Sequence, residues 1–129
     1  MTDPVSLKLT LLEDAIAVCR LEPEAVVPAW AWTGEPASVT RTREELSIVC
    51  RAEAVPEGVR RETGWRCLKV SGPLDFGLTG ILASLAAPLA GAKISIFAIS
   101  TFDTDYVMVK TEHLARTMEV LRAAGHRIG

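Results

Sequence analysis

Hydroxyl, aromatic and carboxylate side chains are concentrated in residues 100–105, which read STFDTD between two apolar runs. Asp103 fits a turn, because aspartate side chains hydrogen-bond to their own backbone there. Asp105 has two interpretations. It is either a second turn former, or its carboxylate accepts hydrogen bonds from a bound ammonium or other cationic group. The first interpretation makes the segment an ordinary hairpin turn, and the second makes it the floor of a binding site.

A glycine-rich segment, SGPLDFGLTG at residues 71–80, offers the complementary chemistry. It precedes an apolar run that predicts a helix with Thr79 as its N-cap. The first turn of a helix carries unpaired backbone N–H groups at the positive end of the helix dipole, and these bind carboxylates. Gly77 and Gly80 would let a ligand approach the backbone closely. With Asp105 for the ammonium group and Phe102 as a wall, these parts suit a free amino acid.

Apolar periodicity in the second half predicts the order strand, helix, strand, strand, helix. The predicted strands are residues 65–71, 94–100 and 106–110, and the predicted helices run from Thr79 to Gly91 and from a Thr111 cap to Gly125. Their inward stripes are Ile81, Leu82, Leu85 and Leu89 on the first helix, and Leu114, Met118 and Leu121 on the second. This order is a nearly complete ferredoxin-like unit. We expect residues 7–12 to supply its missing strand.

The first half predicts a related but less complete unit. Strands are expected at residues 7–12 and 16–21, with a short helix from Glu22 that Pro28 stops. A hairpin of residues 38–41 and 46–51 is expected next, followed by a loop or one helical turn at residues 55–64. A weak internal echo aligns residues 40–50 with 100–110. We therefore predict an α+β protein made of two ferredoxin-like (βαββαβ) units in tandem. Residues 1–62 form the degenerate unit and residues 63–129 the complete one.

Composition excludes several classes of function. The 14 basic and 16 acidic residues give a formal net charge of −2, without the basic face that nucleic-acid binding needs. We expect no membrane span and no signal peptide. The three cysteines have no metal-binding or disulfide spacing, so we expect buried, reduced thiols in the cytoplasm. No nucleophile–base pair, phosphate loop, metal set or cofactor motif is evident, and we expect no enzyme.

The remaining polar and aromatic residues are given structural interpretations. Trp30, Trp32 and Trp65 are expected in the core or at an interface. His113 follows Glu112 at a helix start and is expected to be solvated. His126 lies past the last predicted helix and is expected to belong to a frayed tail.

The run GPLDFGLTGILASLAAPLAGAKISIFAISTFDTDYVMVK resembles the ACT-domain family. The resemblance is closest to small bacterial tandem-ACT proteins related to the arginine-sensing CASTOR proteins and to the regulatory region of aspartate kinase. It covers about residues 71–125, nearly half of the chain, and extends more weakly into the first half. The helix exit reads LAGAKI, where relatives more often have an acidic residue and a glycine. We expect no catalytic domain for such a unit to regulate.

The resemblance implies a regulatory module that binds an amino acid where paired domains meet, and therefore a homodimer with a regulated partner protein. Arginine and lysine are the first candidate ligands. The implied ligand-binding residues are Leu74, Asp75, Phe76, Gly77, Leu78, Thr79, Gly80, Ile81, Ser100, Thr101, Phe102 and Asp105. The alternative is a structural or protein-interaction module whose ligand pocket is vestigial.

Overall fold

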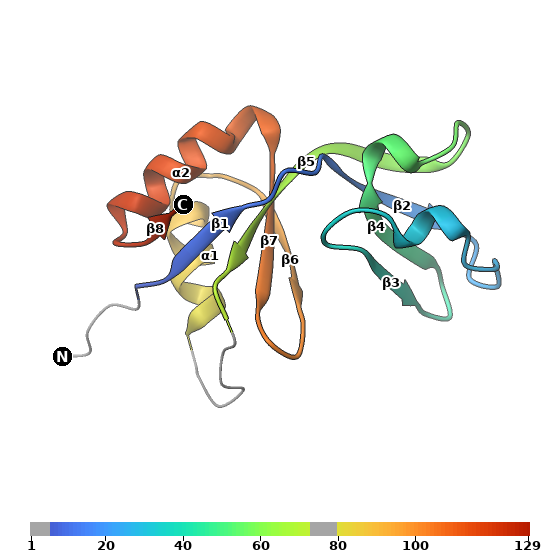
Figure 1. The fold of residues 1–129 in the computed structure, drawn as a ribbon, viewed down its shortest axis with the longest axis horizontal. Coiled ribbons are helices and arrows are strands. Elements are labelled where there is room, and N and C mark those ends of the chain that lie inside the picture. Colours follow the sequence, from blue (N-terminus) through green and yellow to red (C-terminus); the bar gives the residue numbers. More distant parts are fainter. Residues whose placement is uncertain (1–5, 73–79) are drawn as a thin grey trace. The chain divides into compact units, whose positions relative to one another are not determined.

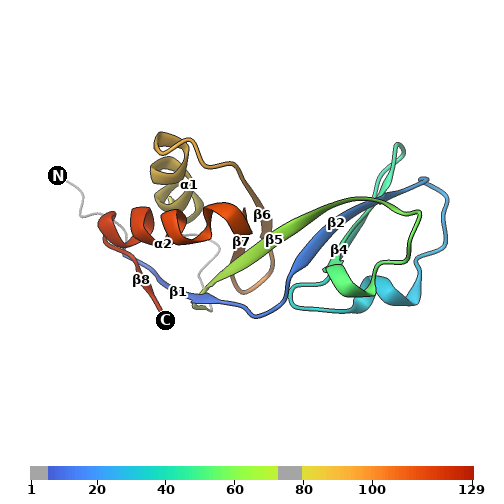
Figure 2. The ribbon, with the colours of Figure 1, turned by 90° about the horizontal axis from the view of Figure 1, so that it is seen from above.

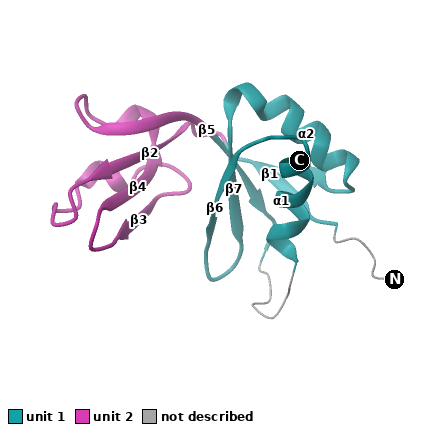
Figure 3. Ribbon diagram, turned by 180° about the vertical axis from the view of Figure 1, so that it is seen from behind, with its two compact units in different colours: residues 1–12, 66–129 teal, residues 13–65 magenta. Residues whose placement is uncertain are grey.

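The computed structural model describes residues 6–72 and 80–129 (Figure 1). The chain divides into two compact units. Unit 1 comprises residues 1–12 and 66–129, and unit 2 comprises residues 13–65 (Figure 3). The long strand β5 (Arg60–Val70) contributes to both units, because its first six residues belong to unit 2 and the rest to unit 1. The expected division at residues 62 and 63 stays a prediction. By packing, residues 6–12 belong with the C-terminal half.

Unit 1 has a sheet with strand order β6–β7–β5–β1–β8. Its other strands are β1 (Lys8–Leu11), β6 (Ile96–Ser100), β7 (Asp105–Lys110) and β8 (Arg127–Ile128). β1 pairs antiparallel with β5, with Leu9 opposite Val70. The prediction that residues 7–12 complete the sheet is therefore confirmed. The short strand β8, which pairs parallel with β1, was not predicted.

Two α-helices pack side by side in unit 1 (Figure 2). They are α1 (Ile81–Gly91) and α2 (Leu114–Ala123), and a 3-10 turn, η3 (Thr111–His113), leads into α2. Thr111 was expected to cap α2, but η3 places His113 at that position. The core joins alternate strand residues to the inner faces of both helices, and its buried members are Leu7, Leu9, Leu68, Val70, Leu85, Leu89, Ile94, Val107, Val109 and Leu121. The predicted stripe of α1 is confirmed.

Unit 2 has the strand order β3–β4–β2–β5. The strands are β2 (Ile16–Leu21), β3 (Ser38–Arg41) and β4 (Leu46–Arg51), with the 3-10 turns η1 (Ala29–Trp32) and η2 (Ala52–Ala54). The hairpin β3–β4 was predicted with these bounds. β5 begins five residues earlier than expected and takes up the second half of the predicted loop at residues 55–64. The buried core of the unit is Ala17, Cys19, Ala31, Leu46, Ile48, Cys50 and Val55.

The helix predicted from Glu22 is wrong. Residues 22–28 form a turn followed by an irregular segment, and the helical piece that follows is η1. The two prolines explain the difference, because Pro28 disfavours the helical conformation of the residue before it and Pro23 leaves only a few residues between them. Trp30 packs against the unit 2 core, whereas Trp32 is 62% exposed and is not a core residue.

His126 is the second correction, because it is buried rather than frayed. Its side chain is 3% exposed. Nδ1 accepts a hydrogen bond from the backbone N–H of Leu7 at 3.1 Å, and Nε2 lies 2.9 Å from the carbonyl oxygen of Ser84. Since Nδ1 is an acceptor, the ring proton belongs on Nε2, which donates to Ser84. The imidazole thus joins the N-terminal segment to α1.

Candidate functional site

The turn between β6 and β7 is closed by threonines. Ser100 lies opposite Asp105 in the antiparallel ladder. The backbone N–H of Thr101 donates to the carbonyl of Thr104 at 2.8 Å, and the Thr101 hydroxyl accepts from the Thr104 N–H at 3.3 Å. Asp103 is exposed and makes no hydrogen bond among the described residues. The turn-forming role expected of Asp103 is therefore taken by Thr101.

A buried hydroxyl fixes the turn to the neighbouring strand. Thr104 is 5% exposed, and its Oγ1 donates to the carbonyl of Val70 at 2.6 Å. Val70 is the last residue of β5, from which the chain continues towards α1. The β6–β7 turn and the start of α1 accordingly lie at the same end of unit 1 (Figure 1). Sequence reasoning missed Thr104, although its three-residue spacing from Thr101 was a usable signal.

Asp105 is half-buried at the first position of β7. Successive residues of a strand point to opposite faces, so Asp105 shares a face with Val107 and Val109. Those two valines pack in the core beneath the helices. Asp105 therefore lies on the helix side of the sheet, with no ion pair or hydrogen bond among the described residues apart from the strand ladder.

The start of α1 has positive electrostatic character, opposite to that of the Asp105 carboxylate, because it is the N-terminal end of a helix. Gly80 occupies the N-cap position with φ at 77°, a left-handed conformation that glycine adopts without strain. Gly80 has no side chain to accept a hydrogen bond from the backbone N–H groups of the first turn, and that turn contains no acidic residue. Ile81 is half-buried against the core. The helix begins at Ile81 rather than directly after Thr79.

The predicted site residues fall into two groups. Those that lie outside the described residues are Leu74, Asp75, Phe76, Gly77, Leu78 and Thr79. Of the others, Ser100, Thr101 and Phe102 are exposed at the end of the hairpin, and Phe102 is 79% exposed. The described residues thus place the hairpin end and the helix start at the same end of unit 1 (Figure 1). The roles of the individual residues stay predictions.

The described residues contain no group of three or more histidine, cysteine or acidic side chains arranged to hold a metal ion. Within the same residues, no helix is both long enough and apolar enough to span a membrane.

Two family models match the chain. The ACT domain model matches residues 60–123. A second model, which describes an N-terminal domain, matches residues 14–58. The boundary between them falls at the start of β5.

Named relatives match about half of the chain. "Cytosolic arginine sensor for mTORC1 subunit 1" from Bos taurus is 39% identical over 66 residues, which cover 50% of this chain and 20% of the relative. The human protein of the same name is 42% identical over 59 residues, which cover 45% of this chain and 18% of the relative. The chain therefore spans about a fifth of the length of these curated relatives.

Solved structures match over nearly the whole chain. A crystal structure of an Agrobacterium tumefaciens protein is 41% identical, with a TM-score of 0.92, and the match covers 97% of this chain and 93% of that one. Aspartate kinase of Clostridium acetobutylicum is 11% identical with a TM-score of 0.67, over 91% of this chain and 34% of the kinase. The second likeness shows a shared fold alone. The mixed α+β fold, the family model and these relatives agree with the resemblance in the sequence, and the chain belongs to the ACT-domain family.

Proposed function

We propose that the protein is a regulatory module without catalytic activity that binds a free amino acid at the end of unit 1 where α1 begins. The observation that supports this most is the hydrogen bond from Thr104 to Val70. It holds the β6–β7 turn beside the end of β5, and Asp105 lies on the helix side of β7. Unit 1 thereby presents two groups at one end: the Asp105 carboxylate, which can accept hydrogen bonds from a cation, and the positive end of the α1 dipole.

The two ends of the ligand would meet different groups. Backbone N–H groups at residues 77–80 and the start of α1 bind the ligand carboxylate. Asp105 binds the ammonium group or a cationic side chain. Because a half-buried carboxylate without a partner is costly, the site selects a ligand that supplies positive charge. Arginine and lysine are the first candidates, and the arginine-sensor relatives favour arginine.

The assembly belongs to the same proposal. Among the described strands, β6 pairs with β7 and lies at the end of the strand order of unit 1, and edge strands are usually covered in folded proteins. We infer a homodimer that acts on a partner protein in the cytoplasm, where the arginine-sensor relatives are named as cytosolic. Unit 2 would be a degenerate ACT unit; the fold shared with aspartate kinase extends over 91% of this chain.

A second candidate function is a protein-interaction module with a vestigial pocket. The exposed ring of Phe102 favours it, because a large aromatic side chain at a hairpin end suits a protein partner. Under this alternative no amino acid stabilises the protein.

A thermal-shift screen of the twenty amino acids separates the two candidates. We expect a concentration-dependent rise in melting temperature with a basic amino acid, because a ligand that binds only the folded state stabilises it. Norvaline, which lacks the cationic group of arginine and lysine, is the control for non-specific stabilisation. A screen in which no amino acid raises the melting temperature would favour the interaction module.

A further inference from the structure

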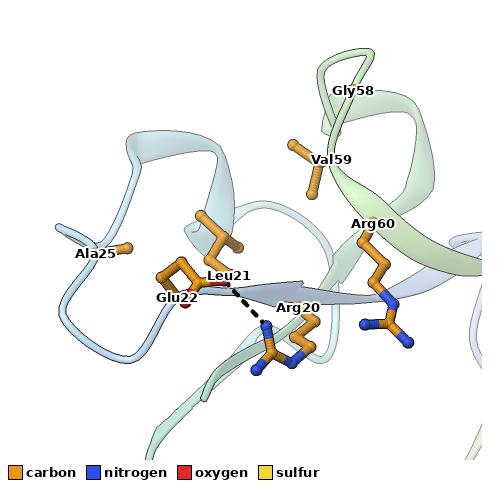
Figure 4. Close-up of a pocket in the computed structure, with 7 residues that line it drawn as sticks. All are labelled: Arg20, Leu21, Glu22, Ala25, Gly58, Val59 and Arg60. Atoms are coloured by element: carbon orange, nitrogen blue, oxygen red, sulfur yellow. Dashed lines mark hydrogen bonds and ion pairs between the residues drawn. The ribbon is translucent and has the colours of Figure 1, made fainter. Parts of the chain in front are cut away.

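Unit 2 contains an open pocket at the end of the ladder between β2 and β5 (Figure 4). Its volume is about 480 Å³, and small-molecule sites typically measure roughly 300–1,000 Å³. The pocket lies where the two strands separate, since β2 ends at Leu21 and β5 begins at Arg60. None of its residues belongs to the predicted amino-acid site.

Two arginines from opposite strands line the pocket. Arg20 and Arg60 are direct partners in the antiparallel pairing of β2 with β5. Residues that face each other in a ladder project from the same face of the sheet, and Figure 4 shows both side chains extending to the same side. Like charges in directly opposite positions destabilise a sheet. A bound anion would remove that repulsion.

The protein itself neutralises these two charges incompletely. Arg20 contacts the carboxylate of Glu22 at 3.4 Å, but the Glu22 side chain is 81% exposed, so solvent screens the pair. The other terminal nitrogen of Arg20 donates to the carbonyl of Glu44, which carries no charge. Arg60 is exposed, with no side-chain hydrogen bond or ion pair in the part of the chain that the structure describes. Its guanidinium group is available to a ligand.

The rest of the pocket is apolar. Leu21, Ala25 and Val59 line it and pack against the edge of the unit 2 core. In Figure 4 the side chains of Leu21 and Val59 lie across the ladder end from the guanidinium groups. Gly58, beside Val59, leaves the mouth open, because a Cβ atom built there would meet no atom within 4 Å.

We propose that this pocket binds a small organic monocarboxylate with a short aliphatic body. Arg20 and Arg60 hold the carboxylate, since paired guanidinium groups offer several N–H donors to its two oxygens. The aliphatic body covers Leu21 and Val59 at the ladder end. Glu22 lies beside Arg20 and repels a second negative charge, so a monocarboxylate binds better than inorganic phosphate. The site is separate from the amino-acid site proposed for unit 1.

Titration calorimetry of the full chain with isocaproate tests this site. Isocaproamide has nearly the same shape without the charge, and inorganic phosphate is an anion without the aliphatic body. We expect isocaproate to bind, and the other two to bind at least about tenfold more weakly, which corresponds to the loss of about one charge-assisted hydrogen bond. Equal binding of the amide would overturn the role of the arginines. Equal binding of phosphate would overturn the aliphatic part of the proposal.

Arg60→Gln is the decisive variant, and Arg43→Gln is its matched control. Both arginines are exposed in unit 2 and lack side-chain partners in the described chain, but Arg43 is outside the pocket. We expect Arg60→Gln to weaken isocaproate binding about tenfold or more, while Arg43→Gln leaves it unchanged. Arg60→Gln should melt no lower than the wild type, because it relieves the repulsion from Arg20. Unchanged binding in Arg60→Gln, or no binding of isocaproate by the wild type at millimolar concentration, would refute the proposal.

Discussion

Replacement of His126 by alanine is expected to destabilise unit 1 strongly. The imidazole is 3% exposed and makes two hydrogen bonds, with the Leu7 N–H at 3.1 Å and the Ser84 carbonyl at 2.9 Å. Alanine leaves both backbone groups without a partner in a buried position, at about 1–3 kcal/mol each. Allowing for partial rehydration, we expect the free energy of unfolding to fall by about 3–5 kcal/mol, a large part of a typical total of roughly 5–15 kcal/mol.

Chemical denaturation and thermal melting measure this loss. For a chain of this size the expected decrease in melting temperature is about 10–15 °C. His126→Asn should recover part of it, because the asparagine side-chain oxygen can accept from Leu7 while the bond to Ser84 is lost. Amide hydrogen exchange at Leu7 should accelerate in His126→Ala and less in His126→Asn.

The matched control is His113→Ala. His113 has a half-exposed side chain, and its nearest carboxylate, that of Glu112, lies 3.7 Å away. We expect the His113→Ala substitution to change the free energy of unfolding by less than about 0.5 kcal/mol. If His126→Ala melts within the range of this control, the imidazole does not join the N-terminal segment to α1, and the reasoning is refuted.

Three further predictions concern the fold, the thiols and the assembly. Residues 63–129 expressed alone should aggregate or stay unfolded, because they lack Leu7 and Leu9 of the core; a soluble fragment that melts cooperatively would contradict this. Burial raises the pKa of the Cys19 thiol to about 11 and also raises that of Cys50. The native thiols should therefore react slowly with a thiol reagent at pH 8, and rapid labelling of the folded protein would count against this. The free energy of unfolding should fall as pH rises from 9.0 through about 11. Light scattering should give a dimer at micromolar concentration, and a stable monomer would weaken the proposed assembly.

The sign of the pH effect follows from proton binding. A folded-state pKa above the unfolded value means that the folded protein retains the thiol proton over that interval. The stabilisation is therefore complete below the unfolded pKa and is lost as pH rises through the folded one. Guanidinium denaturation at several pH values between 8 and 11 measures this loss of stability.

Strong local patterns made much of the fold predictable. Alternating apolar residues identified the β3–β4 hairpin, and the apolar stripe of α1 identified that helix. The strand count of the second half required a further strand, which correctly indicated residues 7–12. In each case the signal lay either within one element or in the number of strands that a ferredoxin-like unit requires.

Other features were not predictable, because they depend on distant contacts without a local signal or on competing local signals. His126 follows the last helix with no local signal, and its partner Leu7 lies 119 residues away. The short strand β8 exists because β1 lies beside it. At Glu22, acidic residues and a proline favoured a helix start, but the second proline overrode them. In the candidate site, the sequence pattern indicated the carboxylates but not the buried hydroxyl of Thr104, which holds the turn against β5.

The most direct test of the proposed function is titration calorimetry with arginine on the wild type and on two matched variants. Asp105→Asn removes the charge that should bind the cationic group, and Asp103→Asn removes a charge from the exposed neighbouring turn. We predict that Asp105→Asn weakens arginine binding by about 1.5–3 kcal/mol, the worth of a hydrogen bond to a charged group, whereas Asp103→Asn leaves binding unchanged. Equal affinity for arginine in all three proteins, or no binding by the wild type, would contradict an amino-acid site at Asp105.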